Sequence, residues 1–594
     1  MNRNVFSAAK HGVQVFYSYI ARHPWLCSFL LCAVSGLLVW CKGAVILHND
    51  DIQLQFLLTN GGCGYSPYLL HSGYLWGYWW SMVAQILPVH SAWMMLANMI
   101  LLFVSLWISC FLFFSRAFSR SREQEPFYLW SRTILILLVF FCIRILLGMP
   151  MYTLVSISLL LAGMGFILLP SREMKAWKRY GAGAILCFIA LCIRIDSLYV
   201  GLVYFGVLSA LIVCNKGKKM WRQIGICGLG LLGIAGCVWG VNYVGNVQNK
   251  EIVQTLSFLK KRISIQDIAD NSGIDKYDRY ARDCKITREQ IDMFKAFIYV
   301  PEMEESGQMD QAVSIHQVGM RGLFGLDWLA KRGILSPEWN ELSKIRQSPV
   351  ALSLWVCLCL AGFLYAFVSK RTWHVPVLYG MFVACIVFLL LTQHRLLDRV
   401  YFPVVMMALI GMGAYLPRKA AYAIEKWKLY LLVAVMGAGT LFVFRHDRHG
   451  LVHLLDSESS PSVDQVSCRE YVQAHPHTIF VCAAPLEMLF PESPLDYSCD
   501  LFRTTNVIPV GGAWIYYTPA YKSFLVAHGM RDPYVALLAD RVVFLVGSHG
   551  QVKATKILQG VKESVERKTG QSMEWRLIED NGKFSCWKAV RVEF

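Results

Sequence analysis

Charged residues are scarce in this chain. Asp, Glu, Lys and Arg make up 16% of its 594 residues, whereas soluble proteins of ordinary composition carry about 25%. Hydrophobic residues make up 56%, and the mean hydropathy is +0.43. This balance excludes an ordinary soluble protein and predicts an α-helical polytopic membrane protein.

Several chemical signatures are also missing. No cysteine spacing matches a zinc site or a redox pair, and no glycine-rich phosphate loop stands at a strand–helix junction. No internal repeat is visible, which argues against an inverted-repeat transporter. Four of the nineteen cysteines share the C-terminal tail, where the sequence is compatible with one or two disulfides or with free thiols: Cys468, Cys482, Cys499 and Cys586.

Long apolar runs recur along the chain, and each is long enough to cross a hydrocarbon core of about 30 Å. We expect about eleven spans. They cover roughly residues 25–47, 91–114, 128–148, 151–169, 181–198, 199–214, 224–244, 349–368, 375–392, 400–416 and 428–444.

The net charge of +17 is confined to short loops between these spans. A nucleic-acid partner is therefore not expected, because the two long polar segments are nearly balanced in charge. The basic clusters occupy every second loop, which places those loops and the N-terminus in the cytoplasm. The clusters are Arg116/Arg120/Arg122, Arg172/Lys175/Lys178/Arg179, Lys216/Lys218/Lys219/Arg222, Lys370/Arg371 and Arg418/Lys419/Lys426/Lys428.

The predicted organisation follows from this orientation, with most polar residues outside the membrane. An N-terminal transmembrane module, 1–244, contains a first outer loop at 48–90. A helical outer segment, 245–348, precedes further transmembrane helices at 349–444. The tail, 445–594, alternates strand-like and helical stretches, including buried strand patterns at 478–482 and 541–546. It predicts a small extracytoplasmic α/β domain.

Two adjacent acids, Asp50 and Asp51, follow the first predicted span, and no Lys or Arg comes after them until Arg116. Such acids at a bilayer surface are costly unless they bind a cation or handle a proton. Alternatively, one of them caps the interfacial helix that we expect over 74–88. The aromatic residues of that helix suit the lipid headgroup level, as an ordinary aromatic belt also would.

Further charged and polar residues fall at the outer ends of predicted helices. Arginine offers a planar fork of donors suited to phosphate oxygens. For a single arginine, the alternative is contact with lipid headgroups or a local ion pair, such as Arg194 with Asp196. The candidates for an anion site are Arg144, Arg194, His394, Arg395, Arg399 and Tyr401.

The layout and three short motifs resemble the GT-C superfamily, the polytopic glycosyltransferases that use lipid-phosphate sugars. The motifs are the acid pair after the first span, the aromatic interfacial segment and the run Arg399-Val-Tyr401-Phe-Pro403. The chain is most similar to the bacterial undecaprenyl-linked branch, which carries a C-terminal extracytoplasmic domain. It departs from protein mannosyltransferases by having Asp-Asp instead of Asp-Glu, which leaves the acceptor class open.

The resemblance implies an inverting sugar transfer from a polyprenyl-phosphate donor to an envelope glycan, lipid or protein, at the outer face of the bacterial cytoplasmic membrane. The role of general base or metal ligand would fall on Asp50 or Asp51, and the outer arginines would hold the donor phosphate. A carboxylate is needed because a sugar hydroxyl is a poor nucleophile. If a metal takes part, carboxylate oxygens favour Mg²⁺ or Mn²⁺.

Three other functions compete with this hypothesis. A polysaccharide polymerase or ligase would share the outer arginines and the lipid-linked donor. A lipid-linked-sugar flippase or transporter should carry charges deep within several spans, but here they cluster at outer helix ends. A non-catalytic assembly protein would use the tail as a binding module.

Overall fold

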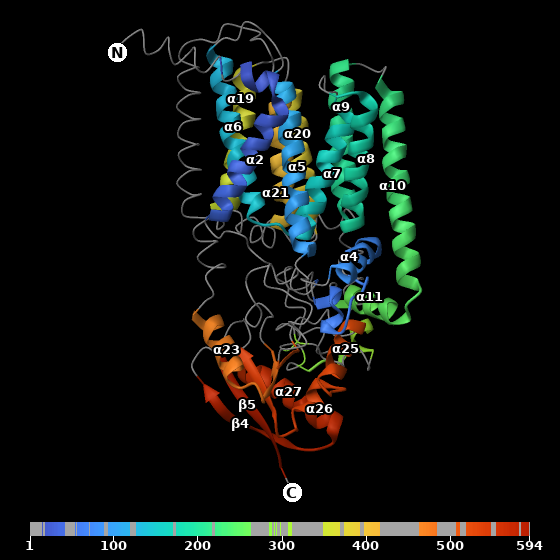
Figure 1. Cartoon of the computed structure of the whole chain (residues 1–594), viewed down its shortest axis with the longest axis vertical. Coiled ribbons are helices and arrows are strands. Elements are labelled where there is room, and N and C mark those ends of the chain that lie inside the picture. Colours follow the sequence, from blue (N-terminus) through green and yellow to red (C-terminus); the bar gives the residue numbers. More distant parts are fainter. Residues whose placement is uncertain are drawn as a thin grey trace, which may run out of the picture.

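The computed structural model describes residues 15, 18–41, 54, 56–69, 72–87, 93–118, 126–169, 174–216, 220–262, 284–287, 290, 293, 298, 307–311, 349–368, 373–392, 397–415, 463–483, 506–510, 518–547, 554–580 and 584–592. They form a bundle of apolar helices and, beyond one end of it, a smaller part built around a β-sheet (Figure 1). We call the described residues from 463 to 592 the sheet unit.

The long helices of the bundle coincide with ten of the predicted spans. They are α2 (Pro24–Cys41), α5 (Trp93–Ala117), α6 (Pro126–Leu147), α7 (Tyr152–Leu168), α8 (Ala176–Ile193), α9 (Ser197–Lys216), α10 (Trp221–Val247), α19 (Pro349–Val368), α20 (His374–Thr392) and α21 (Asp398–Ala414). The eleventh predicted span, 428–444, lies outside the described residues.

Four of these helices are long and apolar enough to cross a membrane by length and composition: Leu96–Ala117, Ala176–Ile193, Ser197–Asn215 and Trp221–Val247. The other six contain shorter apolar stretches within the residues searched. These helices support a multi-pass membrane protein. The total of about eleven spans stays a prediction.

Helix α7 is the centre of the bundle, because nearly all its side chains are buried. It packs closely on α8 where two glycines face each other. A Cβ at Gly163 would lie 2.8 Å from the Gly183 carbonyl oxygen, and a Cβ at Gly183 would lie 2.8 Å from that of Gly163. Small residues allow helix backbones to approach in this way where apolar lipid provides no hydrophobic drive for association.

The two ends of the bundle differ. Successive helices alternate in direction, so α2, α6, α8 and α10 end on the side of the bundle that faces the sheet unit, while α5, α7, α9 and α21 begin on that side (Figure 1). We call this the sheet end. The opposite, basic end carries Arg116, Lys178, Arg179 and Arg222. The described parts of the first loop, of the 245–348 segment and of the tail all lie toward the sheet end (Figure 1). That this end faces the outside of the membrane stays a prediction.

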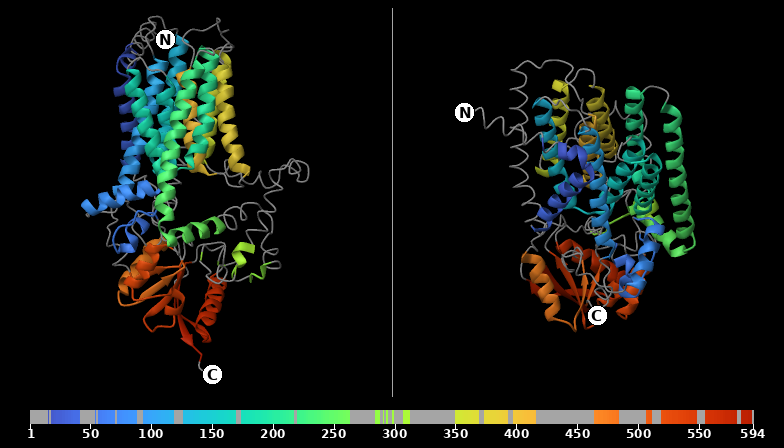
Figure 2. Two further views of the ribbon diagram at one scale, coloured as in Figure 1. Left: turned by 90° about the vertical axis from the view of Figure 1, so that its right-hand side faces the viewer. Right: turned by 45° about the horizontal axis from the view of Figure 1, so that its top comes forward.

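Two helices lie across the bundle axis at the sheet end (Figure 2). One is α4 (Tyr74–Ile86), which confirms the helix predicted over 74–88, and the other is α11 (Lys250–Arg262), which begins the second outer segment. Most of the residues from 263 to 348 lie outside the described part of the chain.

The sheet unit contains a five-stranded mixed sheet in the order β2-β1-β3-β5-β4. Its strands are β1 (Ile479–Cys482), β2 (Val507–Pro509), β3 (Val542–Gly547), β4 (Met573–Asp580) and β5 (Phe584–Arg591). Its helices are α23 (Val463–Ala474), α25 (Pro519–Ala527), α26 (Pro533–Ala536) and α27 (Ala554–Thr569). Strands β1 and β3 pair in parallel, as their continuous apolar sequences predict. Whether the unit is extracytoplasmic stays a prediction.

Cysteines of the sheet unit do not form disulfides among the described residues. Cys468, Cys482 and Cys586 are buried and none of them is part of a disulfide, and Cys499 lies outside the described residues. Buried free cysteine behaves as a small apolar side chain. The sequence left open whether the cysteines of the tail form disulfides, and the three described ones do not.

Candidate functional site

The acid pair itself, Asp50 and Asp51, lies outside the described residues, but the chain that follows it is firmly packed. Leu54 is 1% exposed and Phe56 is 0% exposed. Leu54 comes three residues after Asp51, and three residues span at most about 11 Å. The described chain is thus anchored within three residues of the acid pair in sequence.

The first loop returns to the bundle at the end of α8. The Ser72 hydroxyl donates to the Ile193 carbonyl at 2.7 Å, and the Gly73 amide donates to the Cys192 carbonyl at 3.2 Å. The last carbonyls of a helix have no partner within the helix. The loop supplies two of these missing donors and is thereby held at one place.

Close backbone approach fixes the start of α4. A Cβ at Gly73 would lie 2.4 Å from the Cys192 carbonyl oxygen, so only glycine fits there. Gly73 is also the N-cap of α4, with no side-chain cap. The N-cap residue is therefore not an acid, so the interpretation of Asp50 or Asp51 as the N-cap of α4 is wrong. Instead, the Leu75 amide donates to the Asn242 side chain of α10 at 3.2 Å.

Arg194 follows α8 immediately and is held by polar side chains. Its Nη1 donates to the Thr153 hydroxyl at 2.7 Å and to the Tyr152 hydroxyl at 3.2 Å. Its Nε lies 3.5 Å from the Asp196 carboxylate. The local ion pair anticipated from the sequence is therefore present. No hydrogen bond of Nη2 is found within the described part of the chain, and the side chain is 23% exposed.

The corner between α8 and α9 is rigidified beneath Arg194. The buried Ser156 hydroxyl on α7 lies 2.8 Å from the Ala190 carbonyl and 2.9 Å from the Ser197 hydroxyl. Ser197 in turn donates to the Arg194 carbonyl at 2.7 Å. A guanidinium on a fixed backbone loses little conformational entropy when it binds an anion.

The other predicted site residues are distributed at the same end. Arg144 is 9% exposed near the end of α6, and the half-buried Arg399 lies in the first turn of α21. Tyr401 is 0% exposed, with its ring 4.8 Å from Phe402. His394 and Arg395 lie outside the described residues. Arg144, Arg399 and Tyr401 therefore lie at the same end of the bundle as Arg194. Their convergence on one ligand stays a prediction.

A buried amide on α5 was not anticipated from the sequence. Asn98 is 0% exposed, and neither its Nδ2 nor its Oδ1 has a hydrogen-bond partner among the described residues. It lies in the second turn of α5, at the sheet end. An unsatisfied buried polar group costs about 1–3 kcal/mol, so this side chain requires an explanation beyond stability.

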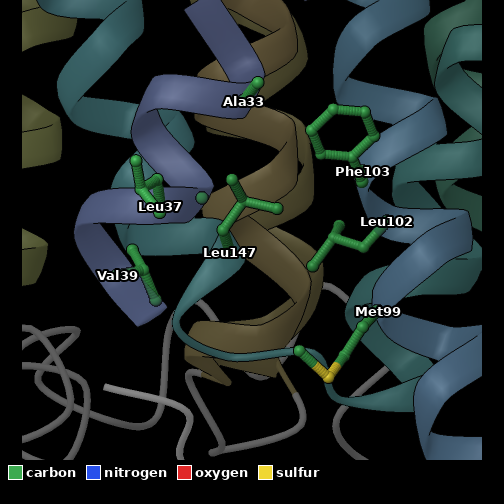
Figure 3. A pocket seen from close by; sticks show the side chains of 8 residues that line it. Ala33, Leu37, Val39, Met99, Leu102, Phe103 and Leu147 are labelled. Carbon is green, nitrogen blue, oxygen red and sulfur yellow. The ribbon is translucent and has the colours of Figure 1, made fainter. Parts of the chain in front are cut away.

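An apolar cavity of about 370 Å³ opens between α2, α5 and α6 (Figure 3). Its lining consists of side chains from the half of each helix nearest the sheet end. They are Ala33, Gly36, Leu37, Val39, Met99, Leu102, Phe103 and Leu147. A cavity with this lining suits a hydrocarbon chain and offers no group for chemistry on a sugar.

The exposed side of α4 is aromatic and apolar, as expected for an interfacial helix. Trp79 is 59% exposed and Tyr78 is 46% exposed, whereas Trp76 and Trp80 face inward at 8% each. Amphipathic rings of this kind are enriched at the membrane–water boundary. The exposed rings therefore fit the predicted position of α4 at the headgroup level.

Metal ligands are not clustered in the part of the chain that the structure describes. There, no group of three or more His, Cys, Asp or Glu side chains is placed to hold a metal ion. The metal role suggested for Asp50 and Asp51 concerns residues outside that part and stays a prediction.

Sequence reasoning anticipated Asp196 but missed the two hydroxyls that hold Arg194 and the residues that hold the first loop. Tyr152 and Thr153 come two and three residues after Pro150, so polar residues at the start of an apolar run were the available signal. Gly73 and Asn242 gave no signal, because their role depends on contact between segments far apart in the chain.

No family model and no curated protein matches the chain. Two solved structures align with 96% of it. The crystal structure of ArnT from Cupriavidus metallidurans in the apo state gives a TM-score of 0.37 at 12% identity and is covered over 98% of its own chain. The structure of the same protein bound to undecaprenyl phosphate gives 0.34 at 12% identity, with 98% of that chain covered. At scores this low, neither comparison assigns a fold or an activity to this chain.

Proposed function

We propose that this protein is a membrane glycosyltransferase of the GT-C type, which transfers a sugar from a polyprenyl-phosphate donor to an envelope glycan, lipid or protein. The observation that supports it best is the placement of Arg194. Its guanidinium is held by Thr153, Tyr152 and Asp196 next to the point where the first loop, which carries the acid pair, rejoins the bundle.

The residues divide into two roles in this proposal. Asp50 or Asp51 takes the proton from the acceptor hydroxyl as it attacks the anomeric carbon. The leaving lipid phosphate develops negative charge, which arginine donors stabilise. Arg194 is the best supported of these donors, and Arg144, Arg395 and Arg399 are further candidates, with His394 and Tyr401 beside them in sequence. If the acids also hold Mg²⁺ or Mn²⁺, the ion would add charge stabilisation.

A lipid donor also needs room for its hydrocarbon chain. The cavity between α2, α5 and α6 is lined by apolar side chains, and Leu147 of its lining lies three residues after Arg144 on α6. Residues three apart lie on one helix face. This arrangement supports a donor whose phosphate lies near Arg144 and whose chain enters the cavity.

Asn98 supports a hydroxyl-rich ligand at the sheet end. Its amide offers two donors and an acceptor, and none of them is used by the described residues. We assign Asn98 to binding of the sugar or acceptor in this proposal, because a hydroxyl group would satisfy both sides of the amide.

The proposed location follows from the asymmetry of the bundle. The basic end faces the bacterial cytoplasm, as the positive-inside rule requires, so the sheet end and the reaction lie at the outer face of the membrane. A transporter would need charges deep within the bundle. The described arginines that we consider instead lie at helix ends, which disfavours that alternative.

The decisive experiment uses purified protein in lipid vesicles with radiolabelled polyprenyl-phosphate sugars and envelope extract. Asp50→Asn and Asp51→Asn are compared with wild type and with Asp310→Asn, an acid that is 62% exposed and paired with Lys261. Loss of a general base lowers the rate by about 10²–10⁴-fold. We expect that loss for one of the first two variants only.

Equal transfer by wild type and both acid-pair variants would refute the base assignment. Product length separates the main alternative from the proposal. Long glycans built from repeated additions would identify a polymerase or ligase, whereas single-sugar products support the glycosyltransferase.

A further inference from the structure

Helix α25 of the sheet unit packs against the first loop, far from it in sequence. The Phe524 ring lies 5.4 Å from the Phe56 ring at 74°, in an edge-to-face arrangement. The Tyr521 ring lies 6.3 Å from the same Phe56 ring. All three side chains are 0% exposed. Buried aromatic pairs of this geometry stabilise a protein by more than their buried area alone would give. The packing of α25 against the first loop is therefore a stabilising contact.

A glycine permits this contact. Gly61 lies in the 3₁₀ helix η1 (Asn60–Gly62) with a φ of +63°. A Cβ at this position would lie 2.6 Å from the Phe524 Cβ and 2.8 Å from the Ala520 carbonyl oxygen. Both the left-handed backbone and the lack of space therefore require glycine where the loop meets α25.

Polar groups fix the direction of the contact. The Asn60 side-chain amide donates to the Ser523 hydroxyl at 3.5 Å, and the Cys63 thiol donates to the Ser523 carbonyl at 3.4 Å. Lys522 also pairs with Glu251 of α11 at 3.1 Å. The Lys522–Glu251 pair is about half exposed and adds little to stability. Outside the sheet unit, α25 is therefore held mainly by the first loop.

Helix α25 is itself fixed to the sheet. The Thr518 hydroxyl caps it by accepting from the Tyr521 amide at 3.2 Å, and the Tyr521 hydroxyl donates to the Pro509 carbonyl of β2 at 2.6 Å. Helix α25 therefore links η1 to the sheet, because it is hydrogen-bonded to β2 and packs against the first loop.

We propose that α25 is a clamp that positions the first loop, so that the sheet unit is part of the sugar-transfer machinery and not a separate binding module. Phe56 and Gly61 are positioning residues. They act through the segment that begins at Leu54 and is joined to Asp51 by two residues. The inference rests on the proposed function for its consequence, whereas the docking itself stands on the contacts.

Docking is tested by a cross-link in the full-length protein in lipid vesicles. Ser523→Cys places a thiol beside the native Cys63, and mild oxidation should join them, as peptide mapping without reductant would show. The control is Val526→Cys on the same helix, because Val526 is 71% exposed. A link at position 523 but not at 526 supports the clamp, and no link at 523 overturns it.

Positioning is tested by the activity of Phe56→Ala. A misplacement of about 1 Å can cost about a hundredfold in rate, so we expect kcat to fall by that order while KM for the donor stays unchanged. Adding Ser523→Cys and oxidising the pair should restore kcat, and a reductant should remove the gain. A purely structural role of Phe56 predicts no such reversible rescue, so its absence overturns the positioning role.

A second variant guards against misfolding of Phe56→Ala. Gly61→Ala combines a strained φ with the clash on Phe524, whereas Gly570→Ala has a similar φ of +67° and no neighbour within 4 Å. Only Gly61→Ala should lower kcat, and equal losses would contradict the clamp. If wild type transfers no sugar, the proposed function and the positioning role both fail, while the cross-link still decides docking.

Discussion

The basic end and the sheet end of the bundle both contain arginines, but the surroundings of these arginines differ. At the basic end, Arg179 donates to the Leu169 carbonyl at 3.2 Å and Arg116 lies 4.6 Å from the Tyr415 ring centre. At the sheet end, Arg194 is held by two hydroxyls and a carboxylate. The ion pairs of Arg194, Lys261 and Lys522 lie at or near the sheet end.

This contrast separates two uses of the same residue type. Positive charge at one end of a helix bundle is what the positive-inside rule associates with the cytoplasmic side, and that orientation stays a prediction for this chain. Arg194 is surrounded by oriented polar groups, and in the proposed function this arrangement prepares it for the donor phosphate. The comparison therefore predicts that equivalent substitutions at the two ends have different consequences.

The largest expected difference concerns the two arginines. Arg194→Met should lower sugar transfer by about ten- to a hundredfold, because a hydrogen bond to a charged group contributes about 1.5–3 kcal/mol. Arg179→Met should leave transfer per folded molecule unchanged and lower only the thermal midpoint. Rates and melting curves of both variants in detergent provide the measurement. Equal rate losses would remove the distinction between the ends.

Two glycines on opposite sides of the bundle provide the next contrast. Gly73→Ala places a Cβ 2.4 Å from the Cys192 carbonyl oxygen, whereas Gly181→Ala near the start of α8 meets nothing within 4 Å. Overpacking costs about 1–3 kcal/mol, while Gly to Ala within a helix stabilises by up to about 1 kcal/mol. Thermal midpoints should therefore move in opposite directions. A tolerated Gly73→Ala would show that the loop does not bind α8 closely.

Asn98 tests whether the sheet end trades stability for function. Asn98→Leu removes a buried amide without partners among the described residues, so it should stabilise the donor-free protein by about 1–3 kcal/mol. Sugar transfer should fall at the same time. Ser105→Ala on the same helix is the control, because that hydroxyl already donates to the Leu102 carbonyl at 2.7 Å. A stabilised Asn98→Leu variant with full activity would exclude a binding role.

The apolar cavity gives a smaller expected effect. A Cβ at Gly36 makes ordinary contact with Leu147 at 3.7 Å, so Gly36→Leu should fill part of the cavity without strain. Displacing two CH₂ groups of a lipid chain costs about 0.8 kcal/mol each, which raises KM for a long-chain donor about tenfold. A short-chain donor should be unaffected. Gly206→Leu on α9, with open space around it, should change neither KM value.

The smallest effect concerns pH and is confined to the sheet unit. Burial raises the pKa of the Cys586 thiol to about 12 from its ordinary value of 9.0. Between these two pH values the Cys586 thiol is therefore neutral in the folded unit, whereas the same thiol is ionised in the unfolded chain. Its contribution to stability is full below pH 9.0 and is lost as pH rises toward about 12.

Limited proteolysis of the sheet unit at about pH 8 and about pH 10.5 measures this change. Wild type should be cleaved faster at the higher pH, and Cys586→Ser should show a weaker dependence because its hydroxyl does not ionise there. The same dependence in both proteins would assign the effect to other groups.

Local sequence determined much of the architecture. The apolar runs specified ten helices whose bounds agree closely with the structure, and the continuous apolar strings at Ile479–Cys482 and Val542–Gly547 specified neighbouring parallel strands. Hydropathy and charge act on each segment independently of where the other segments go. They could therefore be interpreted without knowledge of the tertiary structure.

Only the tertiary structure decided how the candidate site is held together. The partners of Arg194 come from the start of α7, the clamp on the first loop comes from α25, and the cap on α8 comes from Ser72 and Gly73. These contacts join segments up to several hundred residues apart. They depend on side-chain shape and hydrogen-bond direction in the packed molecule, which no hydrophobic period or charge count contains.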